Sequence, residues 1–118
     1  MDTMRNVVKT KEVVGLDVLN GSKENLGKIE EIMLDKISGR VAYVVLSCGG
    51  FLGMGEKLFA IPWNAFHYDP KEKAFLLKID KEKLKNAPSF DKNNWPDMAD
   101  RIWGESLSKY YSSKSYWE

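Results

Sequence analysis

Turn-forming residues interrupt the first two thirds of this 118-residue chain about every ten positions, a spacing typical of short strands. The interruptions include Asn20-Gly21, Ser38-Gly39, Pro62-Trp63 and Asp69-Pro70. Glycine, proline and asparagine are the residues that tight turns favour, because each suits a backbone conformation that strands avoid. The segments between them are rich in β-branched and aromatic residues. The pattern therefore predicts a mainly β fold, either a small antiparallel barrel or a sandwich.

Six segments have the composition of strands: 12–19, 28–36, 40–47, 57–61, 64–68 and 74–79. The segment 40–47 is continuously apolar, which predicts a strand buried on both faces. The segment 28–36 alternates only partly and predicts a strand with a bulge near Met33-Leu34, because Ile32 would break the apolar face of the alternative helix. Gly15 predicts a bend in the first strand. Short turns at 37–39 and 69–72 predict two hairpins.

The character of the chain changes at Asp80. Residues 80–85 predict one or two helical turns before Pro88, and a longer helix is predicted from Pro96 to about Tyr111. Its apolar side would carry Met98, Ile102, Trp103, Leu107, Tyr110 and Tyr111. Seven of the 14 aromatic residues lie in the last 29 positions. Disordered tails are poor in aromatic residues, so this tail is expected to pack on the barrel or on a second copy.

The composition excludes several classes of site. Eighteen basic residues stand against 17 acidic ones, so we expect neither nucleic acid nor an anionic membrane as a partner. A single cysteine and a single histidine allow no intrachain disulfide and no Cys/His zinc site. We therefore expect no metal, no cofactor and no catalytic residues.

The N-terminus has no apolar core of signal-peptide length. The longest apolar run, residues 41–46, is far shorter than the roughly 20 residues that span a bilayer. These features predict a cytoplasmic protein without membrane insertion.

A set of glycine-centred motifs resembles the PRC-barrel domain family. The resemblance runs over residues 12–79 and includes Leu26-Gly27-Lys28-Ile29, with Gly15 and Val18 before it and Asp35 and Gly39 at the following turn. Its most specific pieces are the sequence GGFLGMGEK at 49–57 and Ile61-Pro62-Trp63. Relatives include the cytoplasmic domain of the photosynthetic reaction-centre H subunit and the C-terminal domain of a ribosome maturation factor that docks on a ribosomal protein.

The resemblance implies a small antiparallel PRC-type β-barrel of five or six strands with a C-terminal helical extension. We expect a lead-in over 1–11, the barrel domain over 12–79 and an aromatic-rich extension over 80–118.

Six apolar residues are candidates for an interface with a partner protein. Phe51, Leu52 and Met54 lie on the glycine-rich loop, where they could instead fold back and cap the barrel. Trp95, Trp103 and Tyr110 lie in the extension and could instead pack on the chain's own barrel.

Other candidate sites fit their motifs less well. The loop 50–55 has the first spacing of a phosphate-binding loop, but Glu56 stands where that motif needs lysine. Cys48 and His67 belong to no catalytic motif, and the carboxylates Glu30, Glu31 and Asp35 lack the alternation of a calcium loop.

The sequence thus predicts a non-catalytic protein–protein interaction or assembly module, acting as a homodimer with a protein partner of unknown identity. Two alternatives rest on the relatives: an RNA-processing or ribosome-associated factor, and an adaptor that docks beside a membrane complex.

Overall fold

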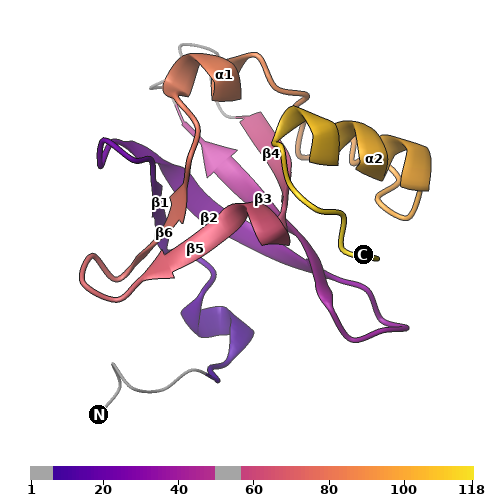
Figure 1. Ribbon diagram of the computed structural model, residues 1–118, viewed down its shortest axis with the longest axis horizontal. Coiled ribbons are helices and arrows are strands. Elements are labelled where there is room, and N and C mark those ends of the chain that lie inside the picture. Colours follow the sequence, from indigo (N-terminus) through magenta and orange to yellow (C-terminus); the bar gives the residue numbers. More distant parts are fainter. Residues whose placement is uncertain (1–6, 50–56) are drawn as a thin grey trace.

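The computed structural model describes residues 7–49 and 57–118, and their fold is mainly β, as predicted (Figure 1). Six strands form one curled sheet: β1 (Asp17–Leu19), β2 (Asn25–Leu34), β3 (Val41–Cys48), β4 (Lys57–Pro62), β5 (Phe66–Asp69) and β6 (Ala74–Leu77). Two α-helices follow, α1 (Lys81–Lys85) and α2 (Arg101–Tyr110), and two short 3₁₀ helices, η2 (Thr10–Glu12) and η4 (Trp63–Ala65), flank the strands. Within the described ranges, no helix has the length and apolarity to cross a bilayer.

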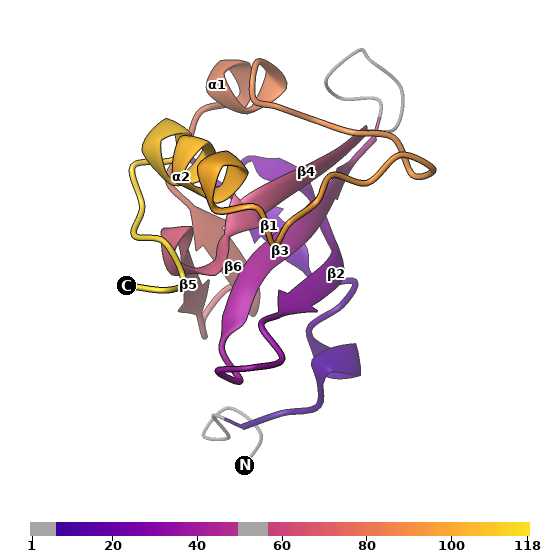
Figure 2. The same ribbon diagram turned by 90° about the vertical axis from the view of Figure 1, so that its right-hand side faces the viewer.

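The strand order is β4-β3-β2-β1-β6-β5. All neighbours are antiparallel except β1 and β6, which pair in parallel through Val18 with Phe75 and Leu19 with Leu76. This one pairing departs from the predicted all-antiparallel arrangement, because the chain returns beside its first strand after passing through the others. The sheet curls into a half-barrel (Figure 2), and η4 carries the chain from β4 to β5.

The hairpin of β2 and β3 forms as predicted, and its bulge lies at the predicted position. The register of the two strands shifts between Met33 and Leu34, and a second time between Ile29 and Glu31. Asp35 closes the turn, since its carboxylate accepts hydrogen bonds from the Ile37 N–H at 3.1 Å and the Ser38 hydroxyl at 2.7 Å.

Gly27 allows the close approach of β2 and β3. Its φ of +147° is unfavourable for other residues, and a Cβ atom there would lie 2.4 Å from the Ser47 carbonyl oxygen. Only glycine fits this position without moving the backbone.

The first strand is shorter than predicted. Residues 10–12 form η2, in which the Glu12 carboxylate accepts a hydrogen bond from the Lys9 N–H at 2.9 Å, and Gly15 turns the chain with φ +95°. The prediction of a strand from residue 12 was therefore wrong, because local hydrogen bonds hold residues 9–14 in a turn.

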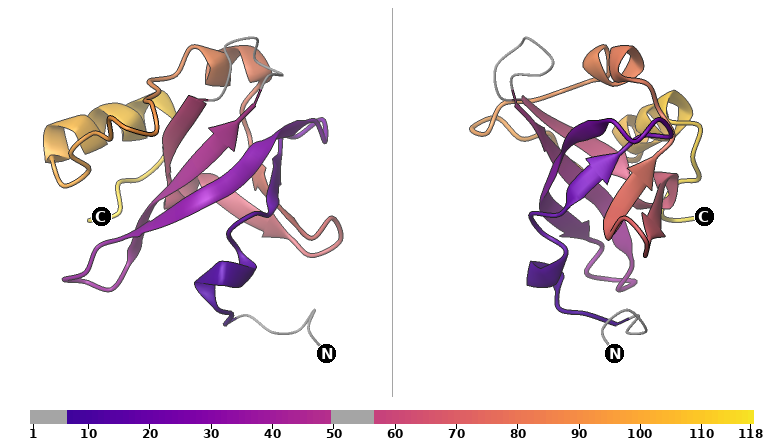
Figure 3. Two further views of the ribbon diagram at one scale, coloured as in Figure 1. Left: turned by 180° about the vertical axis from the view of Figure 1, so that it is seen from behind. Right: turned by 90° about the vertical axis from the view of Figure 1, so that its left-hand side faces the viewer.

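The core has two parts, one on each face of β3, which confirms its predicted burial on both sides. Val44, Leu46 and Cys48 belong to the larger cluster inside the half-barrel. Tyr43 belongs to the smaller one together with Leu107 of α2, and Figure 3 shows α2 against the other face of the sheet.

Helix α2 begins later than predicted, at Arg101 rather than near Pro96. The Asp100 carboxylate accepts a hydrogen bond from the Ile102 N–H at 3.0 Å and so caps the helix, while Asp97 accepts one from the Ala99 N–H and forms a separate turn. The predicted apolar side was also wrong at Ile102, which is 78% exposed.

Candidate protein-binding groove

A groove of about 210 Å³ lies between β4, the segment 88–96 and α2. Its apolar lining includes Pro88, Phe90, Trp95, Pro96, Trp103 and Leu107, and we call it the tryptophan groove. The predicted interface residues Trp95 and Trp103 thus meet on one surface. The other candidates on the glycine-rich loop, Phe51, Leu52 and Met54, lie outside the described residues.

The floor of the groove is an extension of the sheet. After α1 the chain returns to β4, where Phe90 and Leu58 exchange two backbone hydrogen bonds of 2.9 and 3.1 Å. This bridge fixes the Phe90 ring beside Trp95, with their centroids 5.0 Å apart. The Trp95 indole N–H donates to the Lys92 carbonyl at 2.7 Å, so the exposed ring is held by its own loop.

Trp103 forms the opposite wall from α2. Its ring packs edge-on against Tyr43 of β3, with centroids 5.2 Å apart, and so rests on the sheet. The burial around Tyr43 raises the pKa of its hydroxyl to about 12. The buried Tyr43 ring thus supports Trp103 from the sheet.

Tyr110 lies apart from the groove and joins the two helices. Its hydroxyl donates to the Lys83 carbonyl, and the Lys83 ammonium lies 5.3 Å from the ring centroid. The neighbouring Tyr111 packs against both parts of the core, and burial raises the pKa of its hydroxyl. Of the three predicted residues in the extension, the structure brings together only the two tryptophans.

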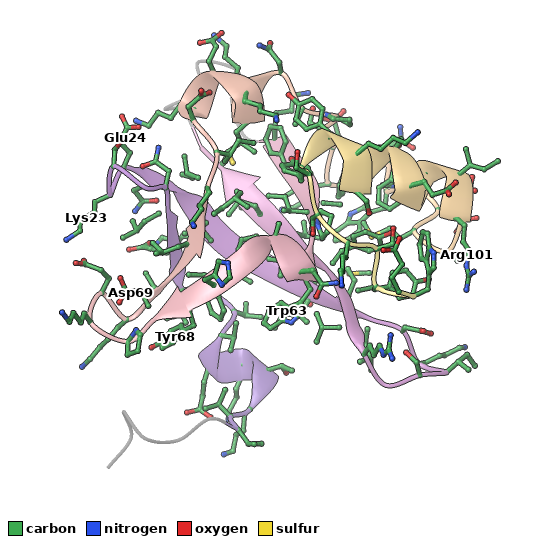
Figure 4. The ribbon with its side chains drawn as sticks, in the orientation of Figure 1. Lys23, Glu24, Trp63, Tyr68, Asp69 and Arg101 are labelled. Carbon is green, nitrogen blue, oxygen red and sulfur yellow. The ribbon has the colours of Figure 1, made fainter. Side chains whose placement is uncertain are left out.

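The groove also contains polar groups, and charges of both signs lie beside it. Ser89 and Asn94 are among its lining residues. Asp97 and Asp100 lie beside the groove, and Lys92 and Arg101 flank the same loop, so the charges there nearly cancel. The nearby Arg101 guanidinium lies 4.8 Å from the Trp117 ring, and Figure 4 shows it at the end of α2.

A second, more polar cleft of about 280 Å³ lies between β5, β6 and the segment after α2. His67, Lys78 and Lys83 are among its lining residues, but Cys48 is not. Burial raises the pKa of the Cys48 thiol to about 12, so it holds its proton at neutral pH and is a poor nucleophile. Among the described residues, no three His, Cys, Asp or Glu side chains gather as metal ligands would.

Sequence reasoning missed one residue of the groove lining and one residue that lets α2 pack closely. Phe90 supplies part of its floor, and its position after Pro88 at the end of a short helix was the available signal. Gly104 lies on the buried face of α2, and a glycine inside an amphipathic helix was the signal for close packing there.

These features define a class of small β domains in which one curled sheet carries an added helix. The chain belongs to the PRC-barrel domain family, whose family model matches residues 5–84. The resemblance seen in the sequence is thereby confirmed. The match ends before Pro88, so the segment and helix that build most of the groove lie beyond it. The predicted boundaries at residues 12, 79 and 80 stay a prediction.

No curated protein matches the chain at a significant level. Among solved structures it is similar to a crystal structure of the 16S ribosomal RNA processing protein RimM from Pseudomonas aeruginosa, with 14% identity and a TM-score of 0.42. That likeness covers 70% of this chain and 49% of the RimM chain, so the chain spans about half the length of that protein.

Proposed function

We propose that this PRC-barrel protein is a non-catalytic protein–protein interaction module that binds a partner through the tryptophan groove. The observation that supports the proposal is a pair of tryptophans, the exposed Trp95 and the half-buried Trp103, that line one concave and largely apolar groove. Trp95 is 39% exposed although its ring packs on Phe90. Tryptophan is enriched at the centres of protein interfaces, because its large ring buries much apolar area when a partner covers it.

The groove suits a partner's side chains better than a small substrate. Its volume of about 210 Å³ is below the roughly 300–1,000 Å³ of pockets that enclose a small molecule. Its lining residues include no histidine, cysteine, lysine or carboxylate, so the Ser89 hydroxyl in the groove has no general base among them. We also propose that the protein works in the cytoplasm and as a homodimer.

The alternative of an RNA-processing or ribosome-associated role receives less support from this site. Phosphate backbones require an excess of cations, whereas the segment 91–101 carries three carboxylates against two cations. No described feature supports the alternative of docking beside a membrane complex.

The proposal can be tested by capturing partners from lysate of the source cell. Full-length protein and the variants Trp95→Ala and Tyr68→Ala would be immobilised, and captured proteins would be quantified by mass spectrometry. Tyr68 is a matched control, because it is an aromatic residue of β5 that is 50% exposed, and Figure 4 shows it away from α2. We expect at least one protein to be captured by the wild type and by Tyr68→Ala, but not by Trp95→Ala. Capture of the same proteins on all three baits would contradict the proposal. Captured proteins that disappear after RNase treatment of the lysate would favour the RNA alternative.

A further inference from the structure

We propose that the end of the chain, residues 112–118, holds one wall of the tryptophan groove in place, so that the groove binds its partner only while this end is docked. We call these residues the C-terminal brace. The inference rests on the proposed function and assigns its regulation to a segment outside the groove. Three observations support it: the return of the chain against α2, an aromatic ring that the brace and the wall share, and the exposed contacts that tie the brace to the barrel.

The chain turns back at the end of α2. Ser112 has a φ of +52°, the left-handed conformation that commonly ends helices. The next N–H group, of Ser113, donates to the Ser108 carbonyl at 2.9 Å. The hydroxyls of Ser108 and Ser115 then form a buried hydrogen bond of 2.9 Å. The brace therefore lies against α2, and Figure 1 shows the chain passing below the helix to its end.

Tyr43 is the ring that the brace and the wall share. It lies edge-on to Trp103 of the wall, with centroids 5.2 Å apart, and edge-on to Tyr116 of the brace, with centroids 5.8 Å apart. A Cβ atom at Gly104, the next residue of α2, would lie 2.5 Å from the Tyr43 hydroxyl oxygen and 3.0 Å from the Trp117 ring. The wall, Tyr43 and the two aromatic residues of the brace thus pack as one group. Loss of the brace would remove part of the support of Trp103.

Helix α2 needs this support, because it buries little by itself. Of its ten residues, Leu107 is the only large apolar one that is buried, and the other two buried residues are Gly104 and Ser108. Isolated helices of this length are marginal in water, so most of their stability comes from packing. Tyr116 packs against the same core cluster as Trp103 and therefore adds apolar contact that the helix lacks.

Two exposed hydrogen bonds tie the brace to the barrel. The Arg40 guanidinium donates to the Tyr116 carbonyl at 3.0 Å, and the Asn64 amide donates to the Lys114 carbonyl at 3.3 Å. Exposed hydrogen bonds contribute little to stability, so the brace can undock at a small fraction of the cost of unfolding the barrel. Because neither Arg40 nor Asn64 lines the groove, the brace and α2 are the route by which they affect it.

The first measurement is amide hydrogen exchange of full-length variants. Tyr116→Ala combined with Trp117→Ala removes both rings of the brace, so the undocked state should predominate and the amides of α2 should exchange about tenfold faster or more. The amides of β2 and β3 should keep their protection, which checks that the barrel is folded. Tyr116→Phe combined with Trp117→Phe keeps two aromatic rings and should restore slow exchange in α2.

A substitution in the barrel tests the tie to the brace separately from the rings. Arg40→Ala removes the hydrogen bond to the Tyr116 carbonyl and should raise exchange in α2 about threefold. Lys36→Ala is the matched control, because it removes an exposed cation from the same hairpin connection and should leave exchange in α2 unchanged.

The second measurement is capture from lysate of the proteins whose binding requires Trp95. Apparent affinity falls in proportion to the fraction of molecules that are competent to bind. The double alanine variant should therefore capture these proteins about threefold more weakly or worse, whereas the double phenylalanine variant should capture them normally. A role of the brace in stability alone would speed exchange in α2 and leave capture unchanged.

Two results would overturn the inference: exchange in α2 that stays slow in the double alanine variant, or fast exchange with undiminished capture. Equal exchange in Arg40→Ala and Lys36→Ala would contradict the tie at Arg40. If capture requires Trp95 but not the brace, the inference is wrong and the proposed function stands. If no captured protein requires Trp95, both are wrong.

Discussion

Gly104 is the residue that lets α2 lie against the sheet. A Cβ atom at this position would lie 2.5 Å from the Tyr43 hydroxyl oxygen and 3.0 Å from two carbon atoms of the Trp117 ring. Tyr43 cannot move aside easily, because its ring is buried and packs edge-on against Trp103 and Tyr116. We expect Gly104→Ala to lower the free energy of unfolding by about 1–3 kcal/mol in urea titrations, although alanine favours a helix by about 1 kcal/mol.

Gly21→Ala is the matched control for that prediction. No atom would lie within 4 Å of a Cβ at Gly21, and its φ is not in the left-handed region. Its free energy of unfolding should change by no more than about 0.5 kcal/mol. Equal effects of the two substitutions would show that Gly104 does not set the distance between helix and sheet.

The burial of the Cys48 thiol and the Tyr43 hydroxyl makes the free energy of unfolding depend on pH. Burial raises its pKa from the ordinary value of 9.0 to about 12, and burial raises that of Tyr43 from 10.0 to about 12. Because the folded state then holds protons that the unfolded state releases, the stabilisation is complete below pH 9 and is lost as the pH rises towards 12. We expect the urea midpoint to fall steadily above about pH 9.

Thiol labelling provides an independent check on Cys48. The native protein should react with a disulfide reagent at pH 8 only as fast as it opens, and labelling should accelerate at urea concentrations that unfold it. Rapid labelling without denaturant would contradict the buried position. The structure has Cys48 at the end of β3, fully buried in the larger core cluster.

The side of α2 that packs on the sheet differs from the apolar side predicted from the sequence. Ile102 and Leu107 were placed on one apolar side, yet Ile102 is 78% exposed and Leu107 is 1% exposed. We expect Leu107→Ala to lower the free energy of unfolding by about 2–5 kcal/mol, because it leaves a cavity against Ala42, Tyr43 and Ala60.

In contrast, Ile102→Ala should change the free energy of unfolding by less than about 0.5 kcal/mol. Both variants lie on the same helix and can be compared in one set of urea titrations. A large loss for Ile102→Ala and a small one for Leu107→Ala would mean that the helix is rotated about its axis relative to the structure.

The errors at the level of elements have a common physical cause. Hydrophobic patterns give weight to large apolar residues, whereas the buried residues of α2 are Leu107 and the small Gly104 and Ser108. Its start was misjudged because Pro96 is a common first residue, but the carboxylate of Asp100 supplies the cap that fixes the helix. In the β region the patterns were stronger, and the bulge at Met33-Leu34 could be predicted from the broken alternation alone.

At the scale of the whole molecule, local signals predict the hairpins but not how the sheet curls. The turn residues determine which strands are joined, and β2 pairs with β3 and β5 with β6 as expected. The parallel pairing of β1 with β6 joins residues more than fifty positions apart, and no turn specifies it. The tryptophan groove could not be predicted from the sequence either. Trp95 and Trp103 were recognised as candidate interface residues, but their proximity depends on the backbone bridge between Phe90 and Leu58.

The far half of β2 is the feature that bears on the predicted homodimer. β1 pairs with β2 only over residues 25–28, and beyond Ile29 the described strand residues lie against β3 alone. Leu34 at the end of this stretch is 61% exposed. An unpaired edge with an exposed apolar residue is a template for pairing with another strand, and a twofold axis would bring two copies of the same edge together.

We therefore expect light scattering to give a mass of twice 13.5 kDa, and Leu34→Lys to give a monomer. Lysine on an edge strand opposes pairing because it would bring two like charges together at the axis. Ile102→Lys is the control, since it adds the same charge at an exposed apolar position of α2 and should leave the dimer intact. A dimer that persists in Leu34→Lys would place the interface elsewhere, whereas a monomeric wild type at high concentration would contradict the predicted homodimer.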